Sequence, residues 1–278
     1  MTAEALMTTV LERSGPWLPA ADPDCALRLI CFPHAGGTPS LYHDWPRLLD
    51  PAVQVVPVLL AGRGLRSHQQ PVSDLRHLVQ DVVQALIQAG HTDRFAMFGH
   101  SMGALLAYEV ACALRDRGLP EPEHLFVSAS KAPHLYGAAA GWPTNDPDLR
   151  RTVGELGGLG ADEEMGLAYL ERRLPVLRAD LRLCAEYVWT PRAPLNCPMT
   201  AFSADGDPVA TPAQMEAWRE YTANSLLRRH LPDGHFYLNH DAGRAALLRF
   251  VRADLDRLFD TVGAGHTHQL PEDSRWTG

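Results

Sequence analysis

One short segment constrains the fold of this chain more than any other. Residues 94–98 form an apolar run that is predicted to be a strand, and Gly99, Ser101 and Gly103 follow it in the pattern Gly-x-Ser-x-Gly, ahead of a helical stretch over 104–117. A sharp turn from strand to helix would hold Ser101 in a strained conformation, with its Oγ above the sheet. The flanking glycines are required because neighbouring backbone comes too close for a side chain.

Further short apolar runs predict strands, and helical patterns lie between most of them. Strands that alternate with helices predict an α/β fold, a mostly parallel central sheet with helices on both faces. Pro57 lacks an N–H for sheet pairing, which either weakens the prediction of this strand or places the strand near an edge. The predicted strands are 27–33, 53–60, 94–98, 125–130, 199–204 and 226–231, and the helices outside the insertion described next are 74–89, 104–117, 211–221 and 241–260.

The alternation is interrupted between the fourth and fifth predicted strands. Residues 136–194 contain no convincing strand and have helical patterns over 148–156, 161–173 and 175–188. A helical insertion of this length is too long for a simple connection, and such insertions are often functional lids. We therefore expect one domain over residues 1–278 that carries a helical lid, followed by a mobile polar tail at 263–278.

Charge and cysteine content exclude several classes of protein. The net charge is −8, which argues against a general nucleic-acid or anionic-membrane binder. The five cysteines include no Cys-x-x-Cys pair, so neither a disulfide framework nor a metal site is expected. Residues 1–15 lack the apolar core of a signal peptide, and no apolar run is long enough to span a membrane. We expect a cytoplasmic protein.

A serine nucleophile needs a base, and the base needs a group that orients it. At a turn of this type the chain order is Ser, then Asp or Glu, then His. His235 lies in a loop between the last predicted strand and the final helix, so it is the candidate base. Asp205 and Asp207 both follow the fifth strand. We favour Asp207, where the loop turns towards the next helix, and leave Asp205 as the alternative, which could instead make turn hydrogen bonds.

An oxyanion hole requires two backbone N–H groups. Met102, the residue after Ser101, should supply one of them. The second should come from the glycine-rich loop 34–37 after the first predicted strand, and we assign it to Ala35. Glycines at the carboxyl end of a strand let the backbone approach a substrate closely.

Several dispersed segments together resemble the type II thioesterases, free-standing α/β-hydrolases that accompany modular polyketide and non-ribosomal peptide synthases. The chain departs from the family pattern at Ala61, where the family usually has Pro, and at Ser203-Ala204, where it often has Gly-Gly. The matching segments are 31–37 (Cys-Phe-Pro-His-Ala-Gly-Gly), 60–64 (Leu-Ala-Gly-Arg-Gly), 98–104 (Phe-Gly-His-Ser-Met-Gly-Ala), 174–180 (Leu-Pro-Val-Leu-Arg-Ala-Asp), 207–209 (Asp-Pro-Val) and 234–238 (Gly-His-Phe-Tyr-Leu).

The resemblance implies a triad of Ser101, Asp207 and His235. It also implies hydrolysis of acyl groups from the phosphopantetheine arm of acyl or peptidyl carrier domains, which removes stalled or aberrant units. No cofactor is expected beyond the phosphopantetheine of the substrate, and a monomer is expected. The alternatives are a general carboxylesterase or lipase and an acyltransferase of the same fold. Arginines of the insertion are candidates for docking an acidic carrier, although a solvated helix face is the simpler interpretation: Arg172, Arg173, Arg178 and Arg182.

Overall fold

The central feature of the protein is one parallel sheet. The computed structural model describes residues 17–137, 145–159 and 163–264. Within these ranges six strands pair in the order β2-β1-β3-β4-β5-β6, every neighbouring pair being parallel. The predicted α/β class is confirmed, and Pro57 is the last residue of an edge strand. The strands are β1 (Leu27–Phe32), β2 (Val53–Pro57), β3 (Phe95–His100), β4 (Leu125–Ser128), β5 (Met199–Ala204) and β6 (Leu226–Leu231).

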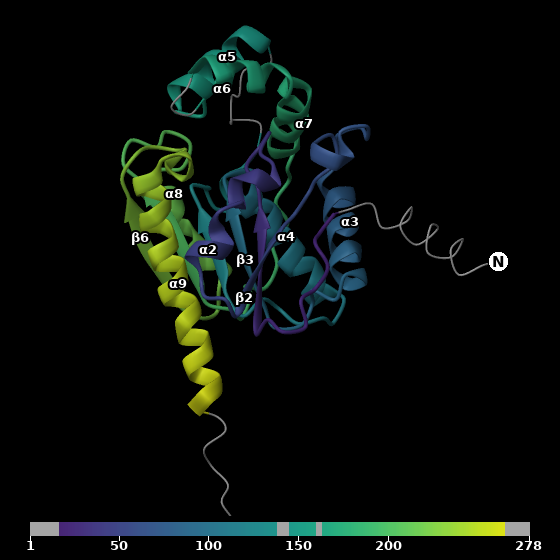
Figure 1. Ribbon diagram of the computed structural model, residues 1–278, viewed down its shortest axis with the longest axis vertical. Coiled ribbons are helices and arrows are strands. Elements are labelled where there is room, and N and C mark those ends of the chain that lie inside the picture. The colour runs from purple at the N-terminus through teal and green to yellow at the C-terminus, as the bar shows by residue number, and fades with distance from the viewer. Residues whose placement is uncertain (1–16, 138–144, 160–162, 265–278) are drawn as a thin grey trace, which may run out of the picture.

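Helices cover both faces of this sheet (Figure 1). On one face lie α3 (Leu75–Gln88), α4 (Met102–Asp116) and α8 (Pro212–Glu216), and on the other lie α2 (Trp45–Leu48) and α9 (Asp241–Ala264). Short 3-10 helices occupy several loops: η1 (Pro39–Tyr42), η2 (Gly64–Arg66), η3 (Pro133–Leu135), η4 (Ala217–Tyr221) and η5 (Tyr237–Asn239). None of the described helices is long and apolar enough to cross a membrane.

The side chains of each strand alternate between two hydrophobic cores. In β3, Phe95 and Met97 join the core beneath α3 and α4, whereas Ala96 and Phe98 join the core beneath α2 and α9. Each successive side chain of a strand points to the opposite face of the sheet. Because both faces are covered, the strands are apolar along their whole length rather than at every second residue.

The insertion lies above the carboxyl ends of the strands (Figure 1). It contains α5 (Asp146–Glu155), α6 (Glu163–Glu171) and α7 (Leu174–Ala185), close to the helices predicted there. These helices have a small core of their own, made of Leu149, Leu170, Leu174, Leu177 and Leu181. Parts of the expected lid, 138–144 and 160–162, lie outside the described residues, as do 1–16 and most of the expected tail, 265–278.

The turn from β3 to α4 packs backbone directly against backbone. A Cβ added to Gly99 would lie 2.2 Å from the carbonyl oxygen of Gly103, and one added to Gly103 would lie 2.2 Å from the carbonyl oxygen of Phe32. No real Cβ tolerates such a contact, so α4 can start this close to β1 and β3 only because both positions are glycine. Ser101 between them has φ 54°, a left-handed conformation that is rare for a residue with a side chain.

We expect Gly103→Ala to destabilise the fold severely, by about 3–5 kcal/mol, because main-chain atoms cannot move aside as a flexible side chain can. Gly118→Ala is the matched control. Gly118 has φ +71° but no heavy atom within 4 Å of the added Cβ, so it should lose only the ~1–2 kcal/mol of left-handed strain. Urea unfolding would measure both changes, and equal losses would contradict the packing argument.

A buried histidine makes the stability of the sheet depend on pH. His124 donates from Nε2 to the hydroxyl of Thr200 at 2.8 Å, and that hydroxyl donates to the Asp254 carboxylate at 2.8 Å. Burial lowers the pKa of His124 from 6.5 to about 4. The unfolded chain therefore binds a proton more readily than the folded one, and acid favours unfolding.

We expect the unfolding free energy of the wild type to fall relative to that of His124→Gln as the pH drops from 6.5 towards 4, the folded-state pKa of His124. The relative loss should approach about 1.4 kcal/mol per pH unit in this window and stop below it. Urea unfolding at a series of pH values measures both proteins. If the unfolding free energies of the two proteins instead change in parallel with pH, the pKa of His124 does not differ between the folded and unfolded states.

Candidate active site

Ser101 lies at the tip of the turn that joins β3 to α4. It immediately precedes the first residue of α4, and its own N–H donates to the carbonyl of Ser128 on the neighbouring strand at 2.8 Å. Its left-handed conformation follows from the glycine contacts on either side. The helix begins directly behind the hydroxyl, so the positive end of the α4 dipole faces the place where a substrate would bind.

His235 reaches Ser101 from the loop that follows β6. His235 Nε2 lies 3.2 Å from Ser101 Oγ, and the imidazole is almost completely buried. The loop turns through Asp233 and Gly234, which have φ 78° and 65°. The N–H of Gly234 donates to the carbonyl of Asp205 at 3.0 Å, which ties this loop to the one after β5.

Asp207, from the loop after β5, lies behind His235. Its Oδ2 is 2.9 Å from His235 Nδ1, and its Oδ1 also accepts from the N–H groups of Val209 at 2.8 Å and Ala210 at 3.2 Å. These are the turn hydrogen bonds that the sequence offered to Asp205. The backbone of its own loop therefore holds the Asp207 carboxylate in place, independently of its hydrogen bond to the imidazole. The His235 Nδ1–H donates to it, which leaves Nε2 as an acceptor for the serine hydroxyl.

Asp205 lies elsewhere. Its Oδ1 is 2.7 Å from Nε2 of His230 on β6, and both side chains are exposed. The structure brings Ser101, His235 and Asp207 into one hydrogen-bonded series, and it does not bring Asp205 into that series.

The loop that carries Ala35 lies beside Ser101. Ala35, Ser101 and His235 line the same cavity. The neighbouring His34 donates from Nδ1 to the carbonyl of Ala35 at 2.8 Å. Burial lowers the pKa of His34 to about 4, so its imidazole is a neutral donor near pH 7. Met102 is the first residue of α4, so its N–H has no partner within the helix.

The cavity beside Ser101 is small and mostly apolar. Its volume is about 70 Å³. The sheet loops supply one wall, with Phe236 beside His235. The helices of the insertion supply the other through Val153, Leu170, Leu177 and Leu181. Within the described ranges, no cluster of three or more His, Cys, Asp or Glu side chains is arranged to hold a metal ion.

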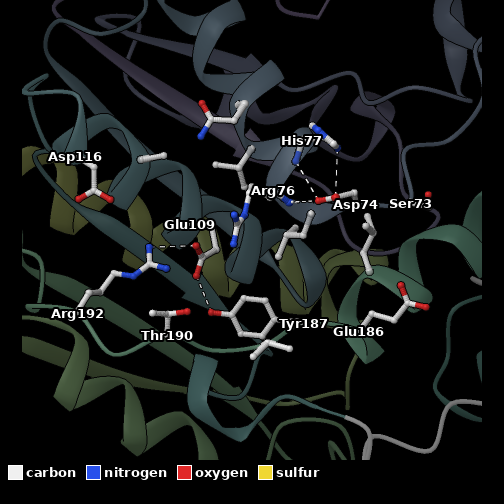
Figure 2. Close-up of a pocket in the computed structure, with 16 residues that line it drawn as sticks. Ser73, Asp74, Arg76, His77, Glu109, Asp116, Glu186, Tyr187, Thr190 and Arg192 are labelled. Atoms are coloured by element: carbon white, nitrogen blue, oxygen red, sulfur yellow. Dashed lines mark hydrogen bonds and ion pairs between the residues drawn. The ribbon is translucent and has the colours of Figure 1, made fainter.

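A larger groove of about 800 Å³ lies elsewhere, between α3, α4 and the segment after α7. Its lining contains none of the residues of the Ser101 series. Figure 2 shows Tyr187 and Arg192 both directed at Glu109: the carboxylate accepts from the Tyr187 hydroxyl at 2.6 Å and pairs with Arg192 at 3.2 Å. This contact fixes the end of the insertion to α4.

Two charged residues near the site, Arg63 and Asp180, are not among the site residues predicted from the sequence. Arg63 and Asp180 form a buried ion pair at 2.8 Å beneath the loop 34–37. Both stand in segments that carry the family resemblance. The signal that could have found Asp180 is its place on the apolar face of α7, flanked by the buried Leu177 and Leu181. A charge on a buried helix face requires a partner.

The chain is similar to thioesterases along most of its length. The thioesterase domain model matches residues 27–255. The structure of RedJ, a thioesterase from the prodiginine pathway of Streptomyces coelicolor, is 54% identical with a TM-score of 0.79, covering 84% of this chain and 94% of RedJ. The type II thioesterase BorB from the borrelidin cluster is 32% identical with a TM-score of 0.75, covering 84% of this chain and 96% of BorB.

The chain is also similar in sequence to a protein of antibiotic biosynthesis. The gramicidin S biosynthesis protein GrsT of Aneurinibacillus migulanus is 34% identical over 235 residues, which is 83% of this chain and 91% of GrsT. These similarities confirm the resemblance to type II thioesterases, and they extend over the sheet, the Ser101 turn and the insertion. The chain belongs to the thioesterase family and is a thioester hydrolase.

Proposed function

We propose that this protein is an editing thioesterase that releases stalled or aberrant acyl groups from the phosphopantetheine arm of carrier domains in a polyketide or non-ribosomal peptide synthase. The observation that carries the proposal is the series Asp207–His235–Ser101, which opens into an acyl-sized cavity under the lid. The relatives named for the prodiginine, borrelidin and gramicidin S pathways support the same setting.

The proposed reaction needs no cofactor of the enzyme. Ser101 Oγ attacks the thioester carbonyl while His235 Nε2 takes its proton, and Asp207 orients the imidazole and stabilises its charged form. The N–H groups of Ala35 and Met102 bind the oxyanion. Collapse of the tetrahedral intermediate breaks the C–S bond, and the imidazolium gives its proton to the departing thiolate. Water activated by His235 then hydrolyses the acyl-serine by the same steps.

The volume of the cavity supports short acyl substrates. A single water needs about 10–15 Å³ of such space, so a cavity of about 70 Å³ accommodates roughly five water-sized groups, which is the number of non-hydrogen atoms in a butyryl unit. Acetyl, propionyl and butyryl units are of this size, and longer chains would require the lid helices to move. The substrate class we propose is therefore a short acyl thioester.

The arginines of the insertion give little support to a basic docking patch. Arg178 pairs with Asp146 at 2.8 Å and Arg182 pairs with Glu186 at 2.6 Å. Arg173 is turned inwards and donates to the carbonyl of Gly37 at 3.2 Å. We therefore treat these three arginines as structural and propose no carrier contact through them.

Ser101→Ala should abolish acyl release from a short-acyl carrier protein, because among the residues that the structure describes Ser101 carries the hydroxyl beside His235 Nε2. Asp207→Asn should lower kcat by roughly 10³- to 10⁴-fold through loss of the imidazole's orientation. Asp205→Asn, two residues away and facing His230, is the matched control and should retain near-wild-type kcat. If Asp205→Asn is the severe variant, the assignment of the acid is wrong.

With carrier protein loaded from acetyl to decanoyl, kcat/KM should be highest at two to four carbons and fall about 10-fold or more by octanoyl, because each further methylene exceeds the cavity. Parallel assays with p-nitrophenyl esters and with acyl-transfer acceptors separate the alternatives. Fast ester cleavage beside inert acyl-carrier would indicate a carboxylesterase or lipase. Acyl transfer to a hydroxyl or amine in place of hydrolysis would indicate an acyltransferase.

A further inference from the structure

A buried ion pair joins the lid to the loop that carries Ala35. Asp180 lies on α7 of the lid and Arg63 lies in the loop after β2, and both side chains are almost completely buried. Asp180 Oδ1 accepts from Arg63 Nη2 at 2.8 Å, and its Oδ2 accepts from the N–H of Gly36 at 2.7 Å. Arg63 Nη1 donates to the carbonyl of Gly37 at 3.0 Å.

These contacts fix the peptide unit that follows Ala35. That unit consists of the Ala35 carbonyl and the Gly36 N–H. His34 donates to the carbonyl at 2.8 Å, and Asp180 accepts from the N–H at 2.7 Å. With both polar groups held from opposite directions, the peptide cannot rotate, and the backbone of Ala35 is restrained on its carboxyl side. An oxyanion donor must be held in place before the reaction if it is to stabilise the charge that develops.

The lid helix also packs against the loop. Gly36 has φ +71°, and a Cβ added there would lie 3.4 Å from Cβ of Leu177, one turn before Asp180 on α7. Withdrawal of α7 would remove the acceptor from the Gly36 N–H and would leave Arg63 buried without its counter-charge. A buried charge that loses its partner is strongly unfavourable, so the pair resists this movement.

We propose that Asp180, itself held by Arg63, is a positioning residue for the oxyanion hole, so that the hole is complete only while lid helix α7 is seated on the loop. The proposal rests on the proposed Ser101 mechanism and extends it. The helix that bounds the acyl cavity through Leu177 and Leu181 then also sets the geometry of the Ala35 donor.

The test compares Asp180→Asn with a buried aspartate far from the site. In Asp180→Asn an NH2 group replaces one of the two carboxylate oxygens, so either Arg63 or the Gly36 N–H would face a donor in place of its acceptor. Asp254 is also buried and also paired with arginines, Arg229 and Arg257, but on α9. Asp254→Asn is therefore matched in chemistry and burial. Arg63→Lys is a second variant. It keeps the positive charge but lacks the planar guanidinium that donates to Asp180 and to the Gly37 carbonyl at the same time.

Hydrolysis of a butyryl thioester and inhibition by propylboronic acid, which forms a tetrahedral adduct on a reactive serine, are measured for each variant. We expect Asp180→Asn to lower kcat by about 10- to 100-fold with KM changed little, and to weaken boronate inhibition by a similar factor. Arg63→Lys should give a smaller loss in both. Asp254→Asn should lower the urea midpoint without changing kcat or boronate affinity.

Wild-type kcat and boronate affinity in a folded Asp180→Asn or Arg63→Lys protein would overturn the proposal. The proposal would also be overturned if Asp254→Asn, at an equal urea midpoint, lowered kcat as much as the Asp180 and Arg63 variants do. The Arg63–Asp180 pair would then be only structural. If Asp180→Asn does not fold, Arg63→Lys decides by the same readouts. Ser101→Ala is assayed alongside: activity in that variant would refute the proposed mechanism itself, whereas its inactivity beside unaffected Asp180 and Arg63 variants would refute the positioning role alone.

Discussion

The structure depends on one close backbone contact, where the start of α4 meets the end of β1. Gly103 lies so near the Phe32 carbonyl that no side chain fits between them, and Gly99 is equally close to Gly103. Ser101, between these two glycines, has a left-handed conformation and stands directly before the first residue of α4. The backbone contact also brings the loop after β1, with Ala35, alongside the serine. A single packing constraint therefore places Ser101 at the start of α4 and beside the loop that carries Ala35.

The parallel sheet explains why the other groups converge there. The carboxyl ends of parallel strands share one edge, so the loops after β3, β5 and β6 are neighbours although they are far apart in the chain. The loop after β5 is held by its own hydrogen bonds, since Asp207 accepts from the backbone of its own turn, and the loop after β6 is tied to it because the Gly234 N–H donates to the carbonyl of Asp205. His235 is thus hydrogen-bonded to a carboxylate that the backbone of its own loop already holds in place.

The insertion contributes side chains to the site. Leu177 and Leu181 on α7 line the cavity beside Ser101, and Asp180 between them accepts from the Gly36 N–H. The sequence indicated the helices of the lid through their apolar spacing, but it gave no reason to pair Asp180 with Arg63, which lies 117 residues away. Apolar spacing along a helix predicts which of its faces is buried. It does not predict which loop packs against that face.

The sequence by itself predicted the elements of the fold and the serine turn of a thioesterase. The apolar runs predicted the strands, and the glycines around Ser101 predicted the turn, because sterics at such a turn admit no other residue. His235 followed from chain order. Tertiary structure alone decided between Asp205 and Asp207, since two carboxylates two residues apart in one loop differ only in the direction that the folded loop gives them. It also decided the order of the strands and the place of Asp180, because burial and pairing between distant segments exist only once the chain has folded.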